Sequence, residues 1–303
     1  MQKKDFLSAG LSFLLLTIVV VICYLERATL IATFRDVSRP WLLIGFASYI
    51  CNYLLRTCRL KSLTNFQTIA FRSLFKICCL HGFFSYFLPM RSGDLSLPLL
   101  LKKDSDISLT IGSAVLIKSR LLDMVSLGFF LLLSTIFSYD QVTAYHLLLF
   151  GICSFCLVAI PYALVFLLRF DKIATLRFFQ KLPPNFQLKH YTLMELTLSF
   201  LIWFFVGCTL FSVVVALSIP LSFLDIWFLT AIQLPLQLVP IQGVANAGNH
   251  EIGWVAGFSV LGISPDLGLS FALASHVAII LYVALLGIVG LLIPITSERQ
   301  PYS

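Results

Sequence analysis

Apolar segments long enough to cross a lipid bilayer recur along nearly the whole chain, and they limit the fold more than any other feature. A transmembrane helix needs about 20 apolar residues. Hydrophobic residues fill 59% of the 303 positions and charged residues only 12%, too few to cover a soluble domain. The sequence predicts an all-α, polytopic membrane helical bundle forming a single transmembrane domain over residues 1–303. Its expected spans are 6–25, 41–58, 107–138, 146–168, 193–217 and 267–293.

Two short polar motifs interrupt the apolar chain. The first motif is Pro89–Asp94 and the second motif is Pro240–Glu251; each ends in an acid preceded by glycine and other turn-forming residues. Each is followed by a short apolar piece and then by a long apolar helix carrying Arg120 or His276. Broken apolar segments at matching places in two halves indicate the binding site of a transporter. Ionisable groups at membrane depth are costly, which also favours a functional role for these residues.

The positions of Lys and Arg predict the orientation of the chain, because cytoplasmic loops carry an excess of both. Basic residues cluster within 56–76 and within 169–189, and Lys3 and Lys4 precede the first apolar segment. These parts, and both termini, are therefore expected in the cytoplasm. The same clustering explains the net charge of +7 better than binding to nucleic acid does, so no nucleic-acid partner is expected.

With this orientation, the segments around the two motifs are expected to form re-entrant hairpins. Segment 73–101 should leave the cytoplasm and return to it, and segment 222–263 should enter from the opposite face. The two halves, about 41–140 and 190–293, would then form an inverted repeat, which suits alternating access. Residues 222–239 are also long enough to cross the bilayer completely, so this alternative stays open.

The first motif and the helix after it supply candidate ligands for an anion. Arg91 is the strongest candidate, since a guanidinium binds phosphate with two hydrogen bonds; alternatively it pairs with Asp94 and fixes the hairpin tip. Gly93 permits a tight turn. Arg120 and Asp123 are three residues apart and share a helix face. This pair would serve either as a structural clamp or as a second substrate contact.

The second motif supplies a carboxylate without a basic neighbour in sequence. Glu251 can pair with His276 or His250, bind a proton, or cap its own helix. Gly248 permits the turn that precedes it. Helices that start near Asp94 and near Glu251 would direct free N–H groups into the site, and such helix termini attract anions.

Metal and cofactor chemistry finds no support in the sequence. The eight cysteines lie in or beside apolar segments and are expected to be small packing residues. No cluster of metal ligands and no nucleotide-binding loop is evident. We therefore expect no metal, no cofactor and no direct use of ATP.

Residues Leu88–Asp94, followed by Lys118–Asp123, resemble the lysylphosphatidylglycerol synthase transmembrane-region family of flippase-like membrane proteins. That family typically has a proline, an arginine or similar residue, then glycine and an acid, and later an Arg-Leu-x-Asp type element. Gly248 and Glu251 resemble its Gly-x-x-Glu element. The likeness covers about residues 5 to 293. In place of the family's common Pro-Gly-Gly stands Val244–Asn246, and His276 stands where a basic residue is often expected.

The resemblance implies movement of a lipid across the cytoplasmic membrane, the lipid being an anionic phospholipid or a lipid-linked saccharide. Some relatives carry an aminoacyl-transfer domain, and the chain ends at Ser303 without one, so we expect no enzyme activity. Two alternatives stay open: an intramembrane lipid-modifying enzyme, and a scaffold for a lipid glycosyltransferase. A homo-oligomer or a membrane-enzyme partner is compatible with each.

Overall fold

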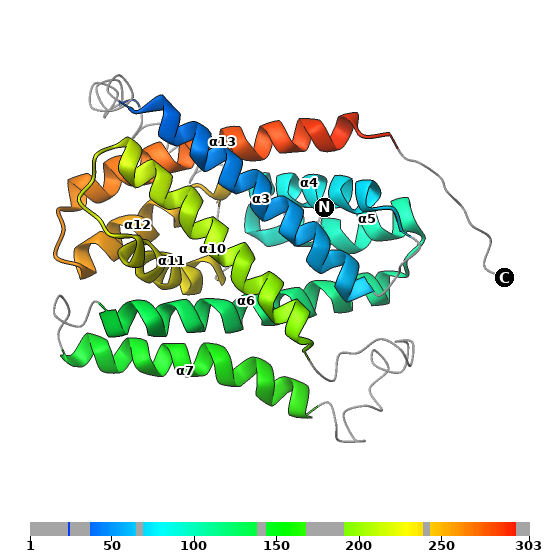
Figure 1. The fold of residues 1–303 in the computed structure, drawn as a ribbon, viewed down its shortest axis with the longest axis horizontal. Coiled ribbons are helices and arrows are strands. Elements are labelled where there is room, and N and C mark those ends of the chain that lie inside the picture. The colour runs from blue at the N-terminus through cyan, green and yellow to red at the C-terminus, as the bar shows by residue number, and fades with distance from the viewer. Residues whose placement is uncertain are drawn as a thin grey trace, which may run out of the picture.

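The computed structural model describes residues 24, 37–64, 69–137, 144–167, 191–238 and 243–294, so the expected span 6–25 lies almost entirely outside the described residues. The described part is all-α, as the sequence predicts (Figure 1). Its elements are α3 (Arg39–Thr64), α4 (Phe71–Phe87), η1 (Pro89–Leu95), α5 (Ser96–Ser105), α6 (Leu109–Phe137), α7 (Ala144–Leu167), α10 (Leu193–Ala216), α11 (Phe223–Leu238), η3 (Val244–Asn246), α12 (Asn249–Val260) and α13 (Pro265–Leu292).

Four of the described helices are long and apolar enough to cross a membrane, which confirms a multi-pass membrane protein. They are α6, α7 through its segment Leu147–Leu164, α10 and α13, and they match four of the expected spans. The expected span 41–58 forms part of α3, which is long but is not among these four. Its C-terminal part carries Arg56, which lines a cavity, and Arg59, which pairs with an acid of α6, as described below.

Helices α4 and α5 form an antiparallel helical hairpin around the first motif. His81 on α4 lies 2.9 Å from Ser96 on α5, measured from ring nitrogen to hydroxyl oxygen. At the outer ends of the arms, the Lys76 ammonium lies 3.8 Å from a carboxylate oxygen of Asp104. The chain becomes helical at Pro89, ahead of Asp94, and runs through η1 into α5. Arg91, inside η1, has a left-handed φ of 55°, so the helical backbone that leads into α5 begins close to Asp94.

Helices α11 and α12 form a second antiparallel hairpin around the second motif. Gly253 lies against Gln233, and Gly257, one helical turn later, lies against Leu229, one turn earlier on α11. With 16 residues, α11 rises about 24 Å at 1.5 Å per residue. This length is less than the hydrocarbon core of about 30 Å, so the helix is short for a complete crossing.

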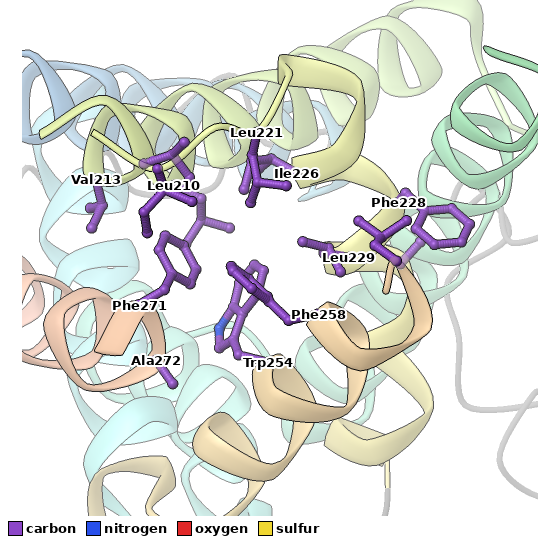
Figure 2. Close-up of a cluster of buried hydrophobic side chains, with 14 of the residues drawn as sticks. Leu210, Val213, Leu221, Ile226, Phe228, Leu229, Trp254, Phe258, Phe271 and Ala272 are labelled. Atoms are coloured by element: carbon purple, nitrogen blue, oxygen red, sulfur yellow. The ribbon is translucent and has the colours of Figure 1, made fainter. Parts of the chain in front are cut away.

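An aromatic core fixes the second hairpin against the long helices. Trp254 and Phe258 of α12 point into the same apolar space as Phe271 of α13 and Leu229 of α11 (Figure 2). All four side chains are buried. In a bilayer such packing stabilises through close van der Waals contact and not through transfer out of water, and these buried rings hold α12 against α13 and α11.

Helices α3 and α10 lie side by side in antiparallel directions (Figure 1). Their packing joins the N-terminal half of the chain to the C-terminal half. The side-chain amide of Asn52 donates to the carbonyl oxygen of Ile202 at 2.9 Å. Nearer the other end of the pair, Gly45 leaves room for Ser212. This close packing places the basic end of α3 beside α6 and the first hairpin.

Candidate functional site

Residues of both polar motifs line one cavity of about 250 Å³. Arg91 and Asp94 come from the first motif, and Asn246 and His250 come from the second. Arg120 of α6 completes the cationic side. The cavity therefore brings together segments that are about 150 residues apart in the chain, as expected for motifs that serve one site.

Charged side chains of alternating sign connect the first hairpin to α6 and α3. Arg59 lies 2.7 Å from Asp123, which lies 3.6 Å from Arg120. Arg120 binds Asp94 at 2.5 Å, and Arg91 lies 4.0 Å from the same carboxylate. Arg120 is thus the close partner of Asp94, whereas Arg91 makes only a long contact. This geometry leaves the Arg91 guanidinium available for a further ligand.

Asp123 acts as a structural clamp among three helices. Arg59 donates to Asp123 and, at 2.9 Å, to Ser199 on α10. The indole N–H of Trp203, also on α10, donates to Asp123 at 3.1 Å. Asp123 is buried and is not among the residues that line the cavity. Of its two predicted roles, the clamp is the one this geometry favours.

The cavity carries excess positive charge and several polar atoms that lack partners. Arg56, Arg91 and Arg120 line it, and Asp94 is the one carboxylate among the described lining residues. The Nε atoms of Arg56 and Arg120, and Oδ1 of Asn246, are buried without a hydrogen-bond partner in the described part of the protein. An unsatisfied buried polar atom costs about 1–3 kcal/mol. These three atoms are themselves enclosed by the protein, so the basis for anion binding is the pair of partly exposed guanidinium groups of Arg91 and Arg120.

Glu251 joins the turn of the second motif to helix α13 through two contacts. One carboxylate oxygen accepts from the backbone N–H of Gly248 at 2.8 Å, and the other contacts Nδ1 of His276. Capping of α12 and pairing with His276 therefore occur together. His250 instead lies 3.0 Å from Ser275. Gly248 has a φ of 87°, a left-handed conformation that favours glycine.

Sequence reasoning missed two arginines of this region. Arg56 lines the cavity and Arg59 lies buried against Asp123, although both served in the sequence as markers of a cytoplasmic loop. Their spacing of three residues within an apolar helix was the available signal, since it places both on one helix face. Among the described residues, no group of three or more His, Cys, Asp or Glu side chains could hold a metal ion.

Comparison with known proteins places the chain in a family. The family model described as "Lysylphosphatidylglycerol synthase TM region" matches residues 7–287, which is most of the chain. It describes the transmembrane region of these proteins, which is separate from the catalytic synthase domain. No curated protein and no solved structure matches the chain. The match runs through both polar motifs and the helices that carry their partners, and the chain therefore belongs to the lysylphosphatidylglycerol synthase transmembrane-region family.

Proposed function

We propose that this protein moves a lipid with an anionic headgroup across the cell membrane and binds its phosphate in the cavity. The observation that carries the proposal is the set of three arginines, Arg56, Arg91 and Arg120, around one cavity. A guanidinium offers several N–H donors in a plane, which suits phosphate oxygens. Membership of a family of transmembrane regions supports a flippase-like role.

The proposal includes two re-entrant hairpins related by an inverted repeat, with both termini in the cytoplasm. The antiparallel arms of α4 and α5 support it, because Lys76 and Asp104 bring their outer ends together. A second support is the repeated pairing of a tip acid with a base on the next long helix. Asp94 binds Arg120, and Glu251 contacts His276.

The hairpin topology predicts the side of the membrane from which single cysteines react. Arg72→Cys at the start of α4 and Lys103→Cys near the end of α5 should both label from the cytoplasmic face. Phe137→Cys, at the far end of α6, should label from the opposite face. An impermeant maleimide applied to sealed vesicles of each orientation measures this, in a variant without native cysteines. Labelling of Arg72→Cys and Lys103→Cys from different faces would exclude the first re-entrant hairpin.

Arg91→Ala should weaken binding of the anionic headgroup and stop its transfer. Loss of one charge-assisted hydrogen bond costs about 1.5–3 kcal/mol, which corresponds to roughly a tenfold to hundredfold weaker affinity. Arg91→Lys should recover only part of the loss, since an ammonium lacks the planar fork. Titration with short-chain phosphatidylglycerol measures affinity, and dithionite quenching of a fluorescent phosphatidylglycerol in phosphatidylcholine vesicles measures transfer between leaflets.

Arg72→Ala is the matched control, since Arg72 is an exposed arginine of α4 and is not among the cavity-lining residues. It should keep wild-type affinity and transfer. Wild-type transfer by a folded Arg91→Ala protein would overturn the role of Arg91. Mass spectrometry of the recovered lipid separates the enzyme alternative, since an enzyme changes the mass of the lipid and a flippase changes only its leaflet.

A further inference from the structure

The contacts of His276 require more hydrogen atoms than an ionised carboxylate and a neutral imidazole provide. Nε2 of His276 lies 2.6 Å from the carbonyl oxygen of Ala245. A carbonyl oxygen only accepts, so Nε2 carries a hydrogen atom. Nδ1 contacts an oxygen of Glu251, and this contact needs a second hydrogen atom on one of its two atoms. The pair therefore holds one additional proton.

The neighbouring histidine has no such requirement. Nε2 of His250 lies 3.0 Å from Oγ of Ser275, and this hydroxyl donates to the carbonyl oxygen of Ala272 at 3.1 Å. Ser275 can thus accept from His250, and one hydrogen atom on this ring satisfies the contact. The two imidazole rings are 4.7 Å apart, so a second positive charge on His250 would be unfavourable. In the described part of the chain, Tyr86 of α4 also has its ring against His276.

The Glu251–His276 pair holds both ends of the turn that faces the cavity. His276 binds the carbonyl oxygen of Ala245, and Glu251 accepts the N–H of Gly248. Between them the backbone is strained at Ala245, which has a φ of 54°, whereas the φ of 63° at Asn246 is one that asparagine adopts more readily. Residues with a side chain rarely adopt this left-handed conformation unless surrounding contacts impose it. The pair supplies such contacts on both sides of the turn.

We propose that Glu251 and His276 form a proton-binding site, and that the bound proton holds the turn of residues 245–248 closed against the cavity. When this proton is lost to solvent, a carboxylate oxygen and the lone pair of Nδ1 face each other. They repel, so His276 cannot keep Glu251 and the Ala245 carbonyl oxygen as partners together. The turn then loses a contact and opens.

Opening of the turn would change the anion-binding cavity, because Asn246 lines it. The cavity arginines Arg56, Arg91 and Arg120 face the same space and carry its positive charge. A proton at Glu251 and an anion in the cavity would then influence each other's affinity, since coupling between two sites is reciprocal. The proton site stands on its own contacts, whereas its link to lipid transfer rests on the proposed function.

Hydrogen–deuterium exchange of the full chain in phosphatidylcholine nanodiscs tests the proton site. The measured quantity is the protection factor of amides 244–248, which corrects each rate for the intrinsic effect of pH. In the wild type we expect it to fall by about tenfold or more from pH 5 to pH 9, as for loss of one or two hydrogen bonds. Constant protection across this range would overturn the proposal.

Glu251→Gln is the sharpest comparison, because glutamine can reproduce the protonated pair without a titratable proton. Its amide can donate N–H to Nδ1 of His276 while its oxygen accepts from Gly248. We expect high protection that does not depend on pH. His276→Gln, which removes the imidazole, should also show no dependence on pH, at lower protection. A wild-type fall with pH that persists in either variant would contradict the proposal.

Binding of short-chain phosphatidylglycerol in the same samples separates this proposal from the proposed function. If protection of the turn does not change with pH while the lipid still binds in an Arg91-dependent manner, the proton site is wrong and the anion site stands. If protection falls with pH in the wild type alone while Arg91→Ala binds the lipid normally, the proton site stands and the proposed function is wrong.

Discussion

Gly93→Ala should separate the arms of the first hairpin and remove anion binding. A Cβ atom at this position would lie 2.1 Å from the carbonyl oxygen of Phe84 and 2.4 Å from its carbonyl carbon. Both atoms belong to the backbone of α4, so no side chain can rotate away. The arms must move apart, which would pull Asp94 from Ser85 and Arg120, now at 3.0 and 2.5 Å. Overpacking of this kind costs about 1–3 kcal/mol or more.

Gly151→Ala provides the matched control for this substitution. Gly151 lies within α7, and a Cβ atom there would meet nothing within 4 Å. Alanine is favoured over glycine in a helix interior by up to about 1 kcal/mol, so this variant should keep or slightly raise stability. Unfolding midpoints in detergent and titration with short-chain phosphatidylglycerol compare the two. Equal stability and equal binding in both variants would contradict the close approach of η1 to α4.

The contact between the first hairpin and α6 could be anticipated from the sequence. Opposite charges within apolar segments must find partners, because an isolated charge is expensive to bury. Because the hairpin is followed directly by α6, Arg120 is a candidate partner for Asp94 wherever the two segments pack together, and the structure places the two in contact. The sequence could not rank Arg91 against Arg120, since the 4.0 Å and 2.5 Å separations depend on the local path of η1.

Counting loop charges could not reveal that several of the counted basic residues are buried beside acids. The rule treats each Lys or Arg as a marker of the cytoplasmic face, but a base can also be buried beside an acid from a distant helix. Arg59 pairs with Asp123, and Lys76 lies near Asp104. Asp123 is far from Arg59 along the chain. The periodicity of residues along one helix contains no information about such a distant partner.

For the second motif, the sequence could predict candidate partners of Glu251 but not the conformation of the backbone. His276 and His250 were both candidates for Glu251, and only packing of α12 on α13 selects His276. The left-handed conformation of Ala245 carried no signal, because alanine seldom adopts it. The clamp on the turn from Ala245 to Gly248 thus emerges only from the three-dimensional contacts.

Lys118→Met should destabilise the protein strongly without a direct effect on the cavity. The Lys118 ammonium lies 2.7 Å from a carboxylate oxygen of Glu195, and both side chains are about 4% exposed. Lys118 stands two positions before Arg120, about 200° around the helix, so the two side chains leave α6 in different directions and Lys118 reaches α10. Removal of one partner of a buried pair leaves an uncompensated charge and costs about 3–5 kcal/mol. The unfolding midpoint in detergent measures the loss.

The double variant Lys118→Met/Glu195→Gln distinguishes a buried ion pair from simple packing of the lysine side chain. Glutamine removes the charge of Glu195 and can still accept from the backbone N–H of Thr192, which the carboxylate accepts at 2.8 Å. Replacement of both partners of a buried pair is often close to neutral, so the double variant should recover most of the lost stability. A double variant as unstable as Lys118→Met alone would place the loss in packing. Because Lys118 and Glu195 are not among the cavity-lining residues, the folded fraction of each variant should bind short-chain phosphatidylglycerol with wild-type affinity.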